Sequence, residues 1–180
     1  MKIEEFDIEG PILIYPDVYE DPRGYFFESY SKEKFASIGI HEDFVQSNQS
    51  LSQKGVLRGL HFQVPPYSQS KLVRVIKGSV LDVAVDIRRS SPTYGRYISL
   101  ILSESNKFIF YIPEGFAHGF LTLEDETIFS YKCGNYYHKP SESGIIWNDA
   151  SLKIDWGIAN PTISEKDKCN VSFNEFFSPF

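Results

Sequence analysis

The sequence has few cysteines, no long apolar run and no excess of positive charge, and each shortage excludes a class of protein. Cys133 and Cys169 are the only cysteines among 180 residues, too few for a disulfide scaffold and without the spacing of a metal site. No apolar run approaches the roughly 20 residues that cross a membrane, and the first residues lack the apolar core of a signal peptide. The formal net charge of -6 argues against nucleic-acid binding. We therefore expect a reduced, cytoplasmic protein with no membrane or nucleic-acid partner.

What the chain does contain is typical of one β-rich domain. Its 180 residues can bury a real core, so residues 1–180 are expected to form a single domain. Hydrophobic residues make up 42% and charged residues 23%, which is typical of a soluble globular protein. Aromatic residues reach 16%, which indicates many strands or a site where aromatic rings stack on a ligand.

Short alternating segments separated by turns predict an all-β fold. Outside the central stretch, strands are expected at Pro11–Tyr15, Tyr25–Tyr30, Asp43–Ser50, Tyr97–Ser103, Lys107–Ile112, Phe116–Leu123 and Thr127–Cys133. One short helix is expected at Lys32–Ile38, capped by Ser31 and ended by Gly39, and the tail from Asn135 is irregular. Strands at this spacing predict a double-sheet jelly roll with one short N-terminal helix and an irregular C-terminal segment.

The central stretch, Gly55–Arg88, predicts two strands joined by a tight turn at Lys77–Ser79. In a paired hairpin, Lys71 shares one sheet face with Asp82 and Asp86, whichever residues centre the turn. The opposite face of the second strand is wholly aliphatic: Leu81, Val83, Val85 and Ile87. A sheet with a lysine and two carboxylates on one face and only aliphatic residues on the other indicates the wall of a polar cavity. A sheet face exposed to solvent has the same pattern.

The first candidate for chemistry is His61, which lies between Leu60 and Phe62 on a strand expected to be buried. A single histidine in such a place is more often a hydrogen-bonded core residue than a catalyst. Arg58 precedes His61 by three residues, so strict alternation along the strand would put the two side chains on opposite faces of the sheet. A bulge at Gly59 brings both side chains to one side, and we take that bulge as an assumption.

A second histidine, His118, ends the motif P-x-G-x-x-H within Pro113–Phe120, which also occurs in metal-binding cupins. Such a metal site needs two histidines one residue apart and a glutamate in the earlier strand. Here that strand has only His61, so we expect no metal and no other cofactor.

Four further polar residues have ordinary structural interpretations. Tyr131 shares a strand face with Phe129, as an amphipathic core residue does. Tyr136 and Tyr137 are either loop aromatics or a stacking platform. Asp167 is predicted to be an exposed charge in a helical turn capped by Ser164.

Taken together, the motifs resemble the dTDP-4-dehydrorhamnose 3,5-epimerases, a family of metal-free cupin-fold enzymes of dTDP-L-rhamnose synthesis. The matching blocks run in order from D-P-R-G-Y-F-F-E (21–28) and Q-S-N-Q-S (46–50) through G-V-L-R-G-L-H-F-Q (55–63), K-L-V-R-V-I-K-G (71–78), D-V-A-V-D-I-R (82–88) and P-E-G-F-A-H-G-F (113–120) to Y-K-C-G-N-Y-Y (131–137), I-I-W-N-D (145–149) and S-E-K-D (164–167). The resemblance covers about residues 11 to 167. It departs mildly at Phe62, where tyrosine is usual, and at Ser70.

The resemblance implies a role for each matching residue. His61 corresponds to the catalytic base, Asp167 to its carboxylate partner, and Tyr131 to the proton donor on the other face of the sugar. Lys71 corresponds to the lysine beside the keto oxygen, and Tyr137 to the aromatic that stacks on thymine. Residues that match nucleotide-sugar contacts are Arg23, Phe26, Glu28, Gln46, Asn48, Arg58, His118, Glu142 and Lys166.

The resemblance also implies a dTDP-4-keto-6-deoxyhexose substrate and a homodimer. The aromatic Tyr25–Tyr30 strand has an open edge that a partner subunit can cover, and the resemblance places Arg23 and Glu28 near the neighbouring site. The same strand can instead fold back on its own chain. Other activities fit the sequence: epimerisation at C3 or C5 alone, sugar-nucleotide ketoisomerisation, or sugar binding by a non-catalytic cupin.

Overall fold

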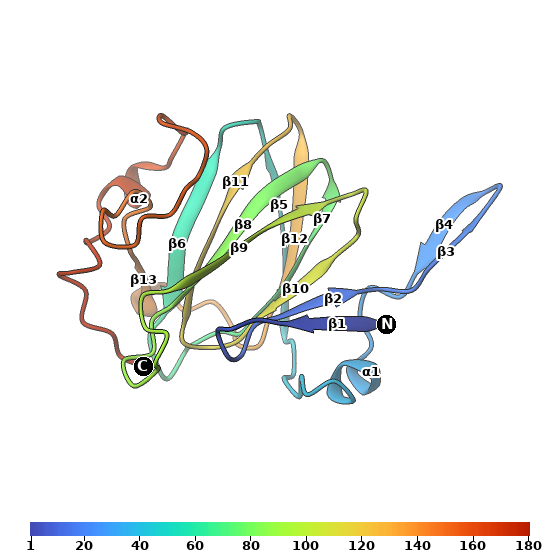
Figure 1. The fold of residues 1–180 in the computed structure, drawn as a ribbon, viewed down its shortest axis with the longest axis horizontal. Coiled ribbons are helices and arrows are strands. Elements are labelled where there is room, and N and C mark those ends of the chain that lie inside the picture. The colour runs from blue at the N-terminus through green and yellow to red at the C-terminus, as the bar shows by residue number, and fades with distance from the viewer.

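The computed structural model describes residues 1–180 as two antiparallel sheets that face each other, with one hairpin projecting from the body (Figure 1). The first sheet has six strands in the order β1 (Lys2–Glu5), β2 (Ile12–Tyr15), β10 (Ile109–Ile112), β7 (Lys71–Lys77), β12 (Thr127–Cys133) and β5 (Gln46–Ser52). The second has five, in the order β13 (Glu142–Gly144), β6 (Leu57–Gln63), β11 (Phe116–Thr122), β8 (Ser79–Asp86) and β9 (Tyr97–Ser103). The projecting hairpin is β3 (Val18–Asp21) and β4 (Gly24–Phe27), and the helical segments are α1 (Lys32–Ala36), η1 (Lys139–Ser141) and α2 (Glu165–Lys168). The predicted all-β double-sheet architecture is confirmed.

Strand alternation builds the core between the two sheets. Val73, Val75 and Phe129 face inward from the six-stranded sheet, and Val80 and Ala84 face them from β8. Because side chains alternate across a strand, the inward parity of Val73 also turns Lys71 inward. One end of the gap between the sheets therefore carries polar side chains.

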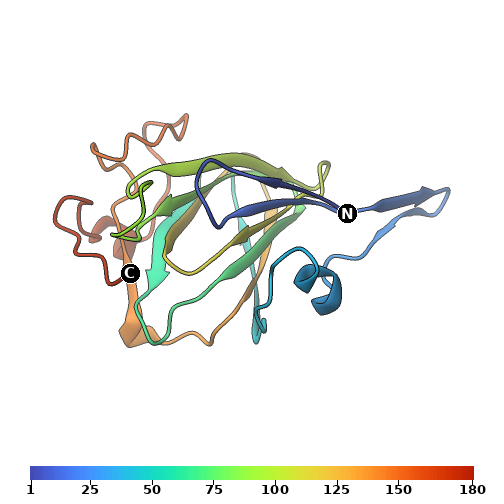
Figure 2. The ribbon, with the colours of Figure 1, turned by 60° about the horizontal axis from the view of Figure 1, so that its bottom comes forward.

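The C-terminal segment covers the outer face of the five-stranded sheet. The aliphatic face predicted for β8 packs there, and Val83, Val85 and Ile87 contact a cluster that includes Trp156 and Phe173. Figures 1 and 2 both show the C-terminal coil at the end of the molecule opposite the β3–β4 hairpin. The segment that the sequence left irregular is thus bound to the sheet by apolar burial.

The predicted hairpin of β7 and β8 is wrong. β7 pairs with β10 and β12, whereas β8 pairs with β11 and β9. The turn at Gly78, with a φ of +80°, carries the chain from one sheet to the other. Alternation defines which side chains share a face. It does not show whether two strands with apolar inner faces are paired in one sheet or belong to two sheets that pack face to face. Lys71 and Asp82 consequently approach each other from opposite walls.

Other differences concern strands and ends. β1 and β3 were not predicted because their side chains are mostly exposed and polar, and β13 lies in the tail judged irregular. α1 ends at Ala36, earlier than the predicted Ile38. No helix has both the length and the apolar character needed to cross a membrane.

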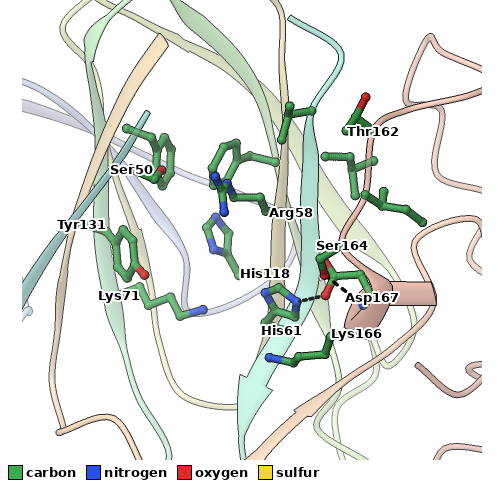
Figure 3. Close-up of a pocket in the computed structure, with 15 residues that line it drawn as sticks. Ser50, Arg58, His61, Lys71, His118, Tyr131, Thr162, Ser164, Lys166 and Asp167 are labelled. Carbon is green, nitrogen blue, oxygen red and sulfur yellow. Dashed lines mark hydrogen bonds and ion pairs between the residues drawn. The ribbon is translucent and has the colours of Figure 1, made fainter. Parts of the chain in front are cut away.

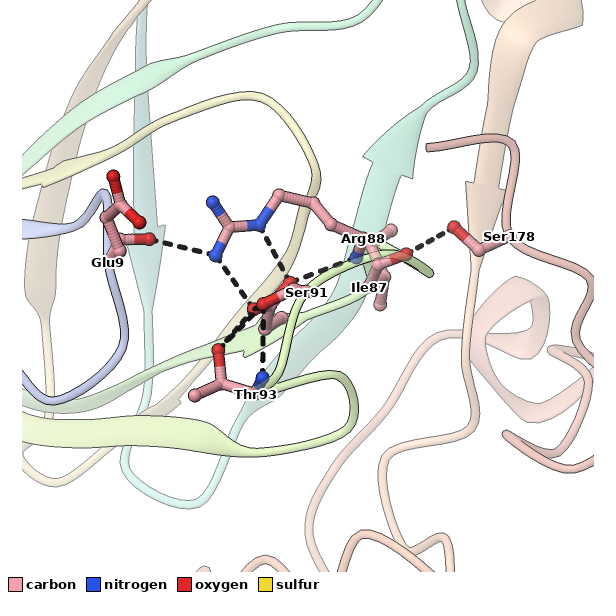
Figure 4. Close-up of polar contacts among 7 residues, drawn as sticks. Glu9, Ile87, Arg88, Ser91, Thr93 and Ser178 are labelled. Carbon is pink, nitrogen blue, oxygen red and sulfur yellow. Dashed lines mark hydrogen bonds and ion pairs between the residues drawn. The ribbon is translucent and has the colours of Figure 1, made fainter.

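A buried polar network at the end of β8 joins three parts of the chain (Figure 4). Asp86 accepts hydrogen bonds from Arg88 Nε at 2.9 Å and Nη2 at 2.8 Å, and from the hydroxyls of Ser91 and Thr93 at 2.6 Å each. Arg88 Nη2 also donates to the Glu9 carbonyl at 2.9 Å. The neighbouring Ile87 carbonyl accepts from Ser178. Every oxygen of this buried carboxylate has a partner, which is the condition for such a network to stabilise a fold.

Candidate active site

A cavity of about 510 Å³ opens at the polar end of the gap between the sheets (Figure 3). Both sheets and the C-terminal segment contribute to its wall. The lining residues are Ser50, Val56, Leu57, Arg58, His61, Lys71, His118, Phe120, Phe129, Tyr131, Thr162, Ile163, Ser164, Lys166 and Asp167. The cavity therefore collects three cationic side chains, two histidines and a tyrosine around a partly apolar floor.

A bulge in β6 brings Arg58 and His61 to the same side. His118 pairs with His61 and Phe120 pairs with Arg58, so two residues of β6 lie opposite one of β11. Gly59 has a φ of +138°, and a Cβ there would lie 2.5 Å from the Cα of Gly119. Only glycine fits this close approach. The bulge that the sequence analysis assumed is confirmed.

His61 is held by a carboxylate from the far end of the chain. Its Nε2 lies 2.6 Å from Asp167 Oδ1, and the two side chains are 27% and 4% exposed. Burial alone would raise the pKa of Asp167, but the His61 hydrogen bond and the Ser164 cap hold that pKa below its usual value. With the carboxyl ionised, Nε2–H donates to it, and the lone pair on Nδ1 is left to act as a base.

The pattern-based prediction that Asp167 is an exposed charge is wrong. Ser164 does cap the helical turn, and its Oγ accepts from the Asp167 N–H at 3.1 Å. However, α2 packs against β6 and directs Asp167 inward. A single helical turn has too few residues to show an apolar face in sequence.

Lys71 and Tyr131 approach from the six-stranded sheet, opposite His61. In Figure 3, Tyr131 and His61 lie on opposite sides of the cavity, and the amine of Lys71 points between them. Burial lowers the pKa of Lys71 and raises the pKa of Tyr131. Lys71 and Tyr131 therefore face His61 across the cavity, the first as a potential cation and the second as a potential proton donor.

His118 forms a second histidine–carboxylate pair beside the first. Its Nε2 lies 3.0 Å and 2.9 Å from the two carboxylate oxygens of Asp82. Burial lowers the pKa of His118 more than Asp82 raises it, so the ring is neutral. The sequence analysis placed Asp82 on a polar cavity wall with Lys71 but predicted neither its contact with His118 nor a role in the site. Its signal was a carboxylate within the otherwise aliphatic run V-L-D-V-A-V.

A second, more polar cavity of about 410 Å³ shares His61, Lys71 and Tyr131 with the first. Its other lining residues include Gln46, Asn48, Tyr137 and Glu142. Gln46 donates to Asn48 at 3.0 Å, as expected for side chains on one strand face. Glu142 accepts from the Tyr137 hydroxyl at 2.8 Å and forms an ion pair with Lys166. The shared side chains therefore lie where the two cavities meet.

Three candidate residues lie outside both cavities. Arg23 and Phe26 belong to the projecting hairpin, where Arg23 pairs with Asp21 at 2.5 Å. Glu28 follows the hairpin and pairs with Lys34 at 3.0 Å. Conversely, sequence reasoning missed Ser50, Phe120 and Phe129 as lining residues, because hydroxyl and aromatic residues at those positions have the pattern of an ordinary strand core.

Comparison with known proteins identifies the family. The family model described as dTDP-4-dehydrorhamnose 3,5-epimerase matches residues 5–175. The chain belongs to this family. It is therefore an epimerase, of the isomerase class, with the cupin-type fold of its structural neighbours.

Relatives in the epimerase family are similar over nearly their whole length. The dTDP-4-dehydrorhamnose 3,5-epimerase of Shigella flexneri is 49% identical over 93% of each chain. A Legionella pneumophila enzyme crystallised with dTDP-4-keto-L-rhamnose superposes with a TM-score of 0.94 at 46% identity, covering 98% of this chain and 94% of that one. A 3′-monoepimerase from Streptomyces bikiniensis superposes with a TM-score of 0.87 at 30% identity, covering 93% and 85%. The fold thus accommodates both double and single epimerisation.

Proposed function

We propose that the protein inverts C3 and C5 of dTDP-4-keto-6-deoxy-D-glucose, the step that gives the L-rhamnose configuration in dTDP-L-rhamnose synthesis. The observation that carries the proposal is the placement of a carboxylate-held histidine and a tyrosine on opposite walls, with a lysine amine between them. Epimerisation beside a ketone removes a proton from one face of the carbon and returns one to the other face. That reaction needs a base and an acid that face each other.

The energetic difficulty explains why a lysine belongs in this set. A ketone α-proton lies roughly 12 pKa units above imidazole, so unassisted transfer is uphill by about 16 kcal/mol. General-base catalysis contributes only about 10²–10⁴-fold. A cation aimed at the developing enolate oxygen in a water-poor site supplies the larger share. Lys71 is the cation in reach of that position.

The catalytic roles follow from this chemistry. His61 takes the α-proton through its free nitrogen, while Asp167 fixes its tautomer and stabilises the imidazolium that forms. Tyr131 returns a proton from the opposite side. Although burial raises the pKa of Tyr131, an enolate carbon is far more basic than a phenolate, so the transfer remains downhill.

The remaining candidates bind the nucleotide. Arg58 and Lys166 supply positive charge for the diphosphate, and guanidinium groups bind its oxygens in pairs. Tyr137, half exposed at the mouth of the polar cavity, offers a face on which thymine stacks. Further polar contacts to the nucleotide-sugar are assigned to Gln46, Asn48, His118 and Glu142. This local basic cluster explains how a protein with net charge -6 accepts an anionic substrate.

The proposal includes a homodimer in which the hairpin of one subunit reaches the neighbouring site. Tyr19, Tyr25 and Phe26 on the β3–β4 hairpin are 66%, 56% and 70% exposed, an aromatic surface that is costly to leave in water. In the proposed homodimer, a second copy of the chain covers this aromatic surface. Arg23, Phe26 and Glu28 of each subunit then complete the nucleotide site of the other.

Incubation with dTDP-4-keto-6-deoxyglucose in deuterium oxide tests the proposal. Double epimerisation introduces deuterium at both C3 and C5, together with inversion at both carbons. Deuterium at one carbon alone indicates the single-position activity known in the Streptomyces bikiniensis relative. No incorporation indicates a sugar-binding protein without catalysis and contradicts the proposal.

A further inference from the structure

Lys71 carries its amine into the cavity without a carboxylate of its own. The ion pairs at the cavity join other residues, His61 to Asp167, His118 to Asp82, and Lys166 to Glu142. Burial lowers the pKa of Lys71, so an isolated amine at this place gives up its proton readily. Stabilisation of an enolate oxygen needs the protonated form. A negative charge near Lys71 is therefore part of what the reaction requires.

Three groups are close enough to raise the pKa of Lys71: Cys133, Asp82 and Glu142. Burial raises the pKa of the Cys133 thiol, so at neutral pH it is uncharged. Glu142 is partly exposed, and the ammonium of Lys166 offsets its charge. These two groups contribute little net field at Lys71. Asp82 is the remaining source.

Asp82 is suited to that task by its burial and by its partner. Its side chain is 0% exposed, and both oxygens are close to the same His118 nitrogen. Since His118 is neutral, the hydrogen bond holds the carboxylate in place without cancelling its charge. In a medium of low dielectric constant such a charge acts over a longer range than at the surface.

The other groups around Lys71 come from every neighbouring element. On its own sheet, β12 contributes Tyr131 and Cys133, whereas the residue paired with Lys71 on β10 is the apolar Ile112. The charged or titratable groups that line the cavities across from Lys71 are His61 and Arg58 on β6, His118 on β11, Glu142 on β13, and Lys166 and Asp167 on α2. Asp82 on β8 is hydrogen-bonded to His118 and is fully buried. Arg58 and Lys166 oppose protonation of Lys71, which makes the contribution of Asp82 more important.

We propose that Asp82 is a positioning residue of the reaction: its carboxylate fixes His118 and keeps Lys71 protonated, so that the ammonium is available to the enolate oxygen. This inference rests on the proposed function for its catalytic consequence. Its electrostatic part concerns Lys71 alone and can be measured without turnover.

The first test is the pH profile of kcat for Asp82→Asn, which keeps the shape and the hydrogen-bond acceptor but removes the charge. The basic limb of the profile, where Lys71 loses its proton, is expected to move toward acid by about one pH unit. The acidic limb is expected to stay in place. A lower kcat with an unmoved basic limb means a merely structural role and overturns the proposal.

Asp86→Asn is the matched control. Asp86 is equally buried on the same strand, but its partners are Arg88, Ser91 and Thr93 outside the cavity. This variant is expected to lower the melting temperature without moving the basic limb. An equal shift in both variants shows that any lost buried charge has this effect, and also contradicts the proposal.

The second test measures Lys71 directly, by competitive labelling of its amine with a trace of acetic anhydride across a pH series, in the absence of substrate. Wild-type Lys71 is expected to be protonated at neutral pH, and Asp82→Asn to lower the midpoint of its labelling curve by about one pH unit. If that variant does not fold, His118→Asn, which keeps the charge of Asp82, is expected to leave Lys71 protonated at pH 7. A wild-type midpoint below pH 7, or deprotonation in His118→Asn, overturns the proposal. Because labelling needs no turnover, it remains decisive even if the keto sugar is not epimerised.

Discussion

His61 and His118 are direct partners across the β6–β11 ladder, and each is hydrogen-bonded to a buried aspartate. The two pairs differ in access. His61 is 27% exposed at the cavity, whereas His118 is buried among strands. Exposure lets His61 exchange protons with a substrate carbon and with solvent, while burial keeps His118 neutral. The same two residue types thus suit a base in one place and a fixed electrostatic support in the other.

His61→Asn removes the proposed base while preserving side-chain size and polarity. We expect deuterium exchange at both sugar carbons to be lost, because the other imidazole on that wall, His118, is buried and hydrogen-bonded to Asp82. Binding of dTDP is expected to stay within a few fold of wild type. NMR detection of exchange, with calorimetry of dTDP binding as the control, checks the expectation. Exchange at the wild-type rate would show that another group is the base.

Tyr131→Phe separates proton removal from proton return. His61 remains able to abstract a proton, so we expect solvent exchange to continue while inversion falls by about 10²-fold or more, the usual scale of general-acid catalysis. Product configuration and deuterium content are measured in one experiment. Normal inversion in this variant would mean that Tyr131 is only a packing aromatic beside Phe129.

Asp86→Asn tests the network at the end of β8. Losing the charge leaves Arg88 without its buried partner, and we expect a loss of about 3 kcal/mol in the free energy of unfolding near neutral pH. Burial raises the pKa of Asp86, but hydrogen bonds from Arg88, Ser91 and Thr93 lower it by more, so the pKa in the folded state is below its usual value.

The sign of the pH dependence follows from that depressed pKa. Its contribution to stability is complete above the unfolded value of about 3.9 and is lost as pH falls through the folded value. The difference between wild type and variant is therefore expected to shrink below about pH 4. Urea unfolding at several pH values checks this, and a difference that grows with acid would contradict it.

Mixing Arg23→Ala with His61→Asn tests whether sites are shared between subunits. In a heterodimer, the hairpin with an intact Arg23 and the cavity with an intact His61 belong to different chains, so one complete site forms. We expect activity to return in part after subunit exchange. Sedimentation as a monomer, or verified exchange without recovery, would count against the shared site.

Local patterns predicted the faces of strands better than their partners. The aliphatic face of β8 was predicted correctly because alternation depends only on the local backbone. The pairing of β7 with β8 was not, since Val73 and Val80 are equally apolar whether they lie in one sheet or face each other across the core. Hydrophobic pattern alone does not distinguish these arrangements.

The site was predictable only in part for the same reason. The bulge at Gly59 could be anticipated because this glycine lies in the strand between Arg58 and His61. The contact of His61 with Asp167 spans 106 positions, and nothing local to either residue indicates it. The expectation that these two residues meet came from resemblance to a family, not from periodicity.

The distance in sequence between His61 and Asp167 also sets the order in which the cavity is completed during synthesis. All strands of both sheets precede α2 in the chain, so a ribosome has delivered both walls before it adds the carboxylate. A nascent chain can form both sheets and still leave His61 without the carboxylate that fixes its tautomer. We therefore expect epimerase chemistry only after α2 has left the exit tunnel and docked on β6.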